Sequence, residues 1–164
     1  MTIDEKIIDV LEKNIDFACS VPCNMLAGIL KKIKDSNIEH IPVTREEEGV
    51  GICAGAYLGG KKPVLIMQNS GFGNLINALL SLTRLYKIPL LLLMSHRGDV
   101  GEKIVAQFPM GCAVPELLKA LKIEYISIKK MDDIYKIDEL ARGAFNKNEV
   151  KAILLSRELW DEEN

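Results

Sequence analysis

The sequence predicts an α/β protein built on a three-layer, doubly wound parallel sheet of about six strands. Short, almost continuous runs of apolar residues, typical of strands buried on both faces, alternate with stretches whose apolar residues recur at helical spacing. The chain has 164 residues, of which 48% are hydrophobic, so it is long enough for one domain with a substantial core. We therefore expect a single domain over residues 1–164.

Three helices and three strands are expected in the first half of the chain. Ile7 and Leu11 lie on one face of an opening helix, and a second helix carries apolar residues from Met25 to Ile33 with lysines on its outer side. A third helix is expected at 45–58, and a turn of two glycines and two lysines follows it. The three strands are expected at 17–21, 38–43 and 63–67.

Three more helices and three more strands follow, with one long interruption. The helices are expected at 74–86, 115–121 and 134–145, and the strands at 89–95, 125–128 and 151–156. The segment 97–111 contains glycines and a proline but no sustained periodicity, which predicts a loop of functional length. Because ligands bind beyond the carboxyl ends of the strands in a doubly wound sheet, we expect this loop to line a crevice with 21–24, 44–45 and 68–71.

The composition argues against several classes of protein. A net charge of −2 and the lack of a stripe rich in lysine and arginine argue against nucleic-acid binding. The longest apolar run, 89–94, is too short to span a bilayer and the first residues form no apolar signal segment, so we expect a cytoplasmic protein with no membrane partner. Four cysteines without C-x-x-C spacing predict reduced thiols and no metal site; they are Cys19, Cys23, Cys53 and Cys112.

Common nucleotide-binding and nucleophile motifs are missing from the sequence. It contains no G-x-x-x-x-G-K-[ST] phosphate loop and no G-x-S-x-G elbow. Gly71 and Gly73 form a G-x-G pair, but the rest of the dinucleotide fingerprint is absent and the pair follows the third expected strand instead of the first. The sequence therefore gives little support to a Rossmann-type dinucleotide site.

Three consecutive carboxylates, Glu46, Glu47 and Glu48, stand at the start of the third expected helix. Acidic residues in a first helical turn are usually solvated and matched to the helix dipole. The residues that follow them, up to Tyr57, are nearly all small or apolar. This pattern indicates a buried helix that neighbouring elements approach closely. At least one of the three glutamates is expected to be buried with it.

The segments 44–58 and 68–74 resemble the pyrimidine-binding (PYR) domain of thiamine-diphosphate enzymes, and the similarity extends over nearly the whole chain. The segments 21–23, 95–98 and 107–111 narrow the resemblance to the phosphonopyruvate and sulfopyruvate decarboxylases. A chain this short is most similar to the separate alpha subunits of that family, which belong to coenzyme M biosynthesis in methanogens. The resemblance implies a carboxy-lyase that converts 3-sulfopyruvate to sulfoacetaldehyde and carbon dioxide.

The resemblance also implies which residues act on the cofactor. In the family's H-E-x-G-A pattern the Glu precedes the Gly by two residues and a Tyr by ten, which selects Glu47 as the catalytic residue. A desolvated, partly protonated Glu47 would hydrogen-bond N1′ of the aminopyrimidine ring and promote loss of the thiazolium C2 proton. Cofactor contacts are expected from four further residues, for which turn-forming roles are the alternative; they are Asn69, Ser70, Gly71 and Asn74.

The diphosphate-binding half of the family's cofactor site does not match this chain. That half carries a G-D-G motif followed by N-N, and these residues bind magnesium and the phosphates. In this chain Gly98-Asp99-Val100 and the residues after it do not match this motif. We therefore expect a separate beta subunit to bind most of the diphosphate and the Mg²⁺ ion. This chain should be active only within a higher-order alpha/beta heteromer.

Substrate contacts are expected at the ends of two strands. The family places such contacts near Pro22, Cys23 and Asn24. Arg97 is expected to bind the sulfonate or carboxylate and His96 to assist proton transfer, because an anionic substrate needs cationic, fork-like donors. The alternative is that His96 is a loop histidine whose hydrogen bonds are made within the chain and that Arg97 is exposed to solvent.

Three other functions stay open at the level of sequence. A phosphonopyruvate decarboxylase subunit is the nearest, because phosphonate and sulfonate differ in charge and protonation and not in shape. A PYR-like module that binds a ligand or partner without turnover is the second, although Glu47 argues against it. A subunit of a transketolase or synthase-type enzyme would require carboligation and a different loop after Ser95.

Overall fold

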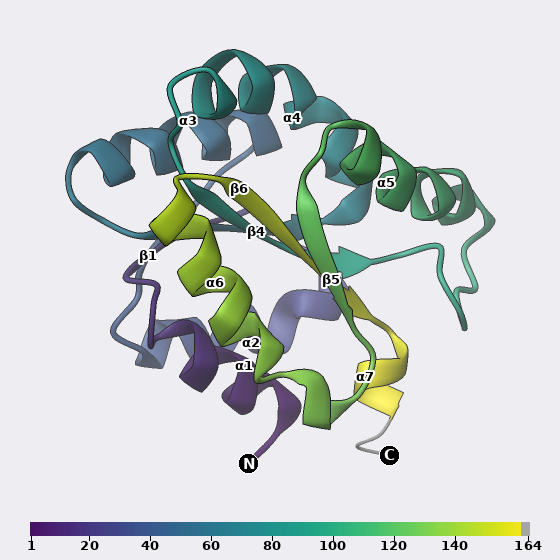
Figure 1. The fold of residues 1–164 in the computed structure, drawn as a ribbon. Coiled ribbons are helices and arrows are strands. Elements are labelled where there is room, and N and C mark those ends of the chain that lie inside the picture. Colours follow the sequence, from purple (N-terminus) through teal and green to yellow (C-terminus); the bar gives the residue numbers. More distant parts are fainter. Residues whose placement is uncertain (162–164) are drawn as a thin grey trace.

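A six-stranded sheet in which every pair of neighbours is parallel forms the centre of the protein (Figure 1). The computed structural model describes residues 1–161, so the last three residues of the predicted domain lie outside the described part. The strand order is β2-β1-β3-β4-β6-β5, which confirms the predicted doubly wound α/β fold. The strands are β1 (Phe17–Ser20), β2 (Glu39–Pro42), β3 (Pro63–Gln68), β4 (Leu90–His96), β5 (Glu124–Ile128) and β6 (Val150–Ser156).

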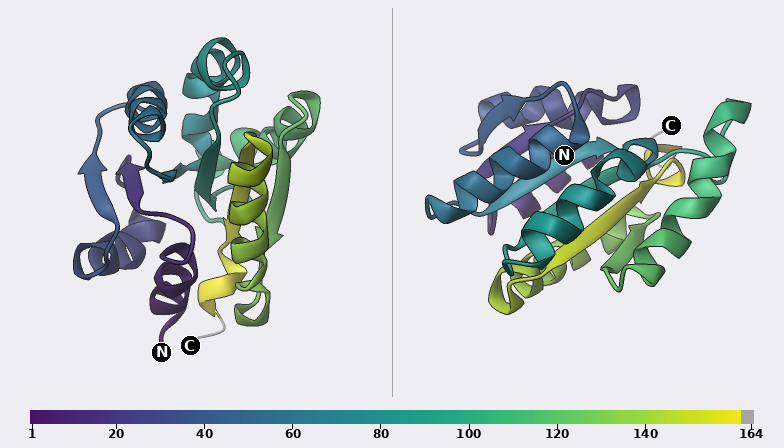
Figure 2. Two further views of the ribbon diagram at one scale, coloured as in Figure 1. Left: turned by 60° about the vertical axis from the view of Figure 1, so that its left-hand side comes forward. Right: turned by 90° about the horizontal axis from the view of Figure 1, so that it is seen from above.

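Helices cover both faces of the sheet, as Figures 1 and 2 show. One face is covered by α3 (Glu46–Leu58), α4 (Phe72–Ala78) and α5 (Phe108–Ala120), and the other by α1 (Ile3–Leu11), α2 (Ala27–Lys32) and α6 (Lys136–Lys147). The short α7 (Glu158–Asp161) returns to α1, where the Trp160 indole donates to the Asp4 carboxylate at 3.0 Å. No helix within residues 1–161 is long and apolar enough to cross a membrane.

Several short helical turns connect these elements. The α4 helix continues as a π-helix, η4 (Leu79–Arg84). The others are 3-10 turns: η1 (Asn24–Leu26), η2 (Ile33–Asp35), η3 (Asn69–Gly71), η5 (Val105–Gln107) and η6 (Met131–Asp133). Of these turns, η1, η3 and η5 directly precede α2, α4 and α5 at the carboxyl ends of the strands, where they shape the entrance to the crevice.

The central strand β4 shows why the apolar runs in the sequence are continuous. Leu91 and Leu93 pack into the core under α1 and α6, whereas Leu90 and Leu92 pack into the core under α3, α4 and α5. Successive side chains of a strand point to opposite faces, so a strand with helices on both sides must be apolar at every position. All seven residues of β4 are buried.

The structure corrects one predicted boundary, because α5 begins at Phe108 and not at 115. Pro109 lies in the first turn of α5, where its missing N–H is harmless. Gly111 lies against the loop, and a Cβ placed on it would come within 2.5 Å of the Arg97 carbonyl oxygen. The predicted loop is therefore shorter, since its second half is helical and packs directly on its first half.

Shortening a buried leucine of β4 tests the two-sided core. We expect Leu93→Ala to lower the free energy of unfolding by about 2–5 kcal/mol, because it opens a cavity at a fully buried position. The same change at Leu85, which is 66% exposed, should cost less than about 0.5 kcal/mol. Urea unfolding of both variants measures the difference, and equal losses would contradict the described core.

Candidate functional site

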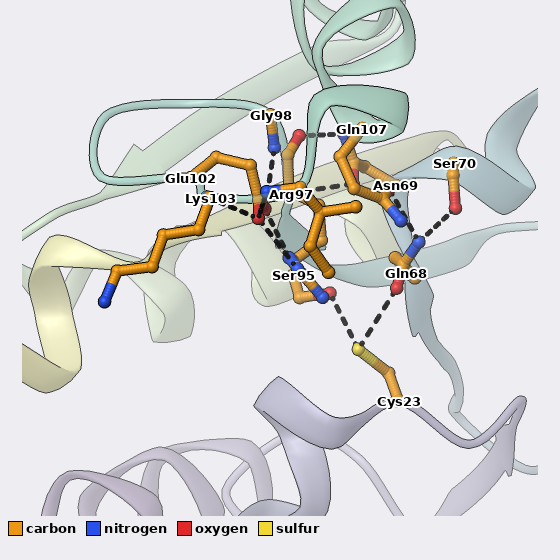
Figure 3. A network of polar contacts seen from close by, with 11 residues as sticks. Cys23, Gln68, Asn69, Ser70, Ser95, Arg97, Gly98, Glu102, Lys103 and Gln107 are labelled. Carbon is orange, nitrogen blue, oxygen red and sulfur yellow. Dashed lines mark hydrogen bonds and ion pairs between the residues drawn. The ribbon is translucent and has the colours of Figure 1, made fainter.

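The carboxyl ends of β1, β3 and β4 meet at one crevice, shown in Figure 3. The Cys23 sulfur lies 3.3 Å from the Ser95 hydroxyl and 3.6 Å from the Gln68 side-chain oxygen. Parallel strands in register bring their ends together in this way although the residues are far apart in sequence. The predicted convergence of strand ends is confirmed for these three strands.

Gln68 connects the crevice to the loop that follows β4. Its side-chain amide donates to Gln107 Oε1 at 3.1 Å and also contacts the Ser70 hydroxyl (Figure 3). One side chain thus joins the turn after β3 to the turn that precedes α5. Neither Gln68 nor Gln107 was predicted as a site residue, and only their positions at a strand end and in the loop could have indicated them.

Asn69 is fully buried and holds the backbone of Arg97. Its amide donates to the Arg97 carbonyl at 3.0 Å, and its side-chain oxygen accepts from the Arg97 amide at 2.9 Å (Figure 3). Both functional groups of the Asn69 side chain are used in this pair. Asn69 therefore positions the end of β4, and its contact with the cofactor stays a prediction.

Arg97 forms a buried ion pair with Glu102. Its Nε and Nη2 atoms donate to the two carboxylate oxygens at 2.6 and 2.9 Å, and the Glu102 side chain is only 3% exposed. The same carboxylate accepts from the backbone amides of Gly98, Lys103 and Ile104 (Figure 3). The Arg97 guanidinium is thus paired with a carboxylate in the chain alone, and its predicted contact with the substrate stays a prediction.

Glu102 owes its ionised state to this arrangement. The Arg97 guanidinium and the three backbone amides hold the pKa of Glu102 well below its usual range, against the opposing effect of burial. A bidentate arginine–carboxylate pair is among the strongest charge-assisted hydrogen-bonded pairs. The segment from Arg97 to Ile104 is accordingly fixed by one carboxylate that the sequence analysis did not single out.

Glu47 stands at the start of α3 with one oxygen paired and one unpaired. Oε1 accepts from Arg45 Nε at 2.5 Å, and Oε2 is buried without a hydrogen-bond partner among the described residues. A hydrogen bond from its own backbone amide and the Arg45 guanidinium lower the pKa of Glu47. These groups favour the ionised carboxylate in the chain alone, and the partly protonated Glu47 stays a prediction for the cofactor-bound site. The buried, unpartnered Oε2 is the feature expected of a group that awaits a ligand donor.

Glu46 joins α3 to the turn after β3. Its carboxylate accepts from the Asn74 amide at 3.0 Å. It also lies directly over Gly71, where an added Cβ would approach Glu46 Oε1 to 2.1 Å. Gly71 and Asn74, both predicted as cofactor contacts, therefore lie against Glu46 in the first turn of α3.

His96 has partners that do not suit the role predicted for it. Its Nε2 donates to the Gly111 carbonyl at 3.0 Å, and its Nδ1 lies 3.4 Å from an Asp99 carboxylate oxygen. Adjacent side chains of a strand point to opposite faces, so His96 turns toward α5 while Ser95 faces Cys23. Each ring nitrogen therefore has a nearby partner in the chain alone, and the proton-transfer role of His96 stays a prediction.

The remaining predicted residues lie around the crevice or close to it. Pro22, Cys23 and Asn24 line a cavity of about 860 Å³ between α2 and β2. Within residues 1–161, no group of three or more His, Cys, Asp or Glu side chains could hold a metal ion. All four cysteines are free thiols, as predicted.

Comparison with known proteins gives consistent results. Residues 1–109 match the model of the thiamine pyrophosphate enzyme, N-terminal TPP binding domain. Sulfopyruvate decarboxylase subunit alpha from Methanococcus maripaludis is 50% identical over 154 residues, which cover 93% of this chain and 92% of that protein. Sulfopyruvate decarboxylase from Methanosarcina acetivorans is 38% identical over 96% of this chain, which corresponds to only 41% of that longer protein.

A solved structure shares the fold at low sequence identity. The 2-oxoglutarate:ferredoxin oxidoreductase from Magnetococcus marinus superimposes with a TM-score of 0.72 and 14% identity. The match covers 95% of this chain and 29% of that chain. At this identity it shows the fold alone.

Removing the Glu102 carboxylate should alter the acid stability of the protein. A carboxyl whose pKa is lowered by folding contributes stability above its unfolded pKa of about 4.3, and this contribution is lost as the pH falls through the lower folded value. We expect Glu102→Gln to lower the free energy of unfolding at pH 7 and to flatten its fall between about pH 5 and 2.

Urea unfolding at several pH values measures this effect. Glu116→Gln is the matched control, because Glu116 forms only an exposed ion pair with Lys119. Identical pH profiles for the two variants would show that Glu102 does not anchor the loop.

Proposed function

The chain belongs to the thiamine pyrophosphate enzyme family, as a member of the sulfopyruvate decarboxylase alpha subunits, and we propose that it is the pyrimidine-binding subunit of a sulfopyruvate decarboxylase. The reaction would release carbon dioxide from 3-sulfopyruvate and leave sulfoacetaldehyde, a step of coenzyme M biosynthesis. The observation that carries this proposal is the buried, unpartnered Glu47 Oε2 at the start of α3.

Glu47 would bind the aminopyrimidine end of thiamine diphosphate. Its free Oε2 can accept a hydrogen bond that no described residue supplies, which makes it a fitting partner for a protonated ring nitrogen. Displacement of Arg45 and the exclusion of water on assembly would raise the pKa of Glu47 toward the range in which it can exchange a proton. Gly71 and Asn74 would complete this side of the site, with Ser70 beside them.

The substrate would lie on the side of the crevice formed by Pro22, Cys23 and Asn24. The Cys23 thiol and Ser95 hydroxyl can orient a carboxylate or keto oxygen there by hydrogen bonds. When bound, thiamine diphosphate supplies the electron sink that accepts the electron pair released as carbon dioxide departs. The chain's own residues would bind and orient the reactants and hold the proton at Glu47.

A second polypeptide would complete the site. After Glu48, α3 carries no charged residue, and Gly51 and Gly55 are exposed with nothing in this chain within 4 Å of an added Cβ. Glycine inside a helix costs about 0.5–1 kcal/mol relative to alanine, so two exposed glycines favour close approach by another chain. The longer relative from Methanosarcina acetivorans, more than half of which this chain does not match, supports a diphosphate-binding part outside this chain.

We assign the diphosphate and Mg²⁺ mainly to that beta subunit, within an alpha/beta heteromer in the cytoplasm. The described residues contain no cluster able to ligate a metal, and the four thiols are unpaired, as suits a reducing compartment. Leu80, Leu85 and Tyr86 on and after η4 are exposed as well. These three residues, together with Gly51 and Gly55 of α3, form the proposed docking face.

Assembly is the first test of the proposed function. Carbon dioxide release from sulfopyruvate, with thiamine diphosphate and Mg²⁺, should be detectable for the chain co-expressed with a diphosphate-binding partner and absent for the chain alone. Phosphonopyruvate serves as the competing substrate, and a larger kcat/KM for it would reassign the enzyme. An assembled pair inert toward both substrates would contradict a decarboxylase.

Glu47→Gln tests the catalytic residue. Loss of the carboxylate should lower kcat of the assembled enzyme by about 10²–10⁴-fold, as expected when a group that positions or exchanges a proton is removed. Glu48→Gln is the matched control, because Glu48 accepts only from Thr44 at the start of α3. Full activity in Glu47→Gln would favour the alternative in which the domain binds without catalysing.

A further inference from the structure

An anionic substrate requires a cation, and the structure shows which cations near the crevice are already neutralised. Arg97 is paired with Glu102 through two hydrogen bonds, and Arg45 is paired with Glu47. A guanidinium that is held bidentately by a carboxylate adds no net charge to the site. The cations to consider near the crevice are therefore those that have no carboxylate partner in the described chain.

Two unpaired lysines line the cavity next to the crevice. The cavity of about 860 Å³ between α2 and β2 shares Cys23 and Asn24 with the substrate side and is also lined by Lys31 and Lys34. Neither lysine forms an ion pair with any described residue. The described lining contains no aspartate or glutamate, so the potential inside is positive.

His40 on β2 forms the inner wall of this cavity together with Ser20. The His40 Nε2 atom lies 2.8 Å from the Ser20 hydroxyl, and the Ser20 side chain is buried. Burial and the neighbouring Lys34 ammonium lower the pKa of His40. A neutral imidazole beside an unpaired lysine is therefore the state of the chain without a ligand, and an anion placed between them would favour the protonated ring.

We propose that this cavity, which also contains Pro22 of the substrate side, is the anion-binding part of that side and takes small sulfonate and carboxylate dianions through Lys31, Lys34, His40 and Asn24. The identity of the anion as substrate or product rests on the proposed function, whereas the site itself does not. Its shared residue Cys23 connects it to the crevice, so a bound 2-oxo acid is collected next to the place where it reacts.

Histidine NMR can test this site directly, because the chain contains only two histidines, His40 and His96. The probe is sulfoacetate, a dianion that has no 2-oxo group and cannot be decarboxylated, added to the full chain alone and in the assembled complex. We expect a saturable shift of the His40 signal and a raised His40 pKa, with the His96 signal unchanged. Sodium sulfate tests whether the His40 response requires a sulfonate. Sodium chloride at equal ionic strength measures how much of the response comes from salt screening alone.

Two charge-matched variants decide the outcome. Lys34→Gln should raise the dissociation constant for sulfoacetate about fivefold or more, as loss of one charge-assisted hydrogen bond predicts. Lys122→Gln, which removes an exposed lysine that lines a different cavity, should leave it unchanged. The proposal is overturned if His40 does not respond, if chloride produces the same shift, or if both variants behave alike. An assembled complex that decarboxylates neither substrate but still shows the His40 response would refute only the decarboxylase assignment.

Discussion

The structure depends on one constraint: all six strands are parallel, so their carboxyl ends and the loops that follow them meet at the same edge of the sheet. Backbone groups in such loops have no strand partner and need other hydrogen bonds. Two side chains meet much of this need after β4, because Asn69 pairs with the backbone of Arg97 and Glu102 accepts from three amides. These hydrogen bonds fix the positions of the loop backbone without help from a ligand or partner.

The same edge is incomplete in one specific respect. Among residues 1–161, none donates to the buried Glu47 Oε2, and none would lie within 4 Å of a Cβ added to the exposed Gly51 and Gly55 of α3. Both features are costly in an isolated domain, and the proposed function accounts for them, because a bound cofactor would supply the donor and a partner would cover the helix.

Much of the fold could be predicted from the sequence, because strands buried on both faces and amphipathic helices leave clear periodic patterns. The start of α5 could not, since Pro109 and Gly111 indicate a loop unless the packing of Gly111 against Arg97 is known. Glu47 was selected by family resemblance and not by periodicity. The partners of Arg97 and His96, Glu102 and Gly111, could not be predicted because they are set by how the chain folds back after β4.

The most direct test is a crystal structure of the assembled alpha/beta complex with thiamine diphosphate and Mg²⁺. The account predicts Glu47 Oε2 within about 2.6–3.2 Å of N1′ of the aminopyrimidine, with Arg45 displaced and the diphosphate held by the partner chain. It would be contradicted by a pyrimidine ring bound to Glu46 or Glu48, or by a Glu47 that keeps its pair with Arg45 while the cofactor lies elsewhere.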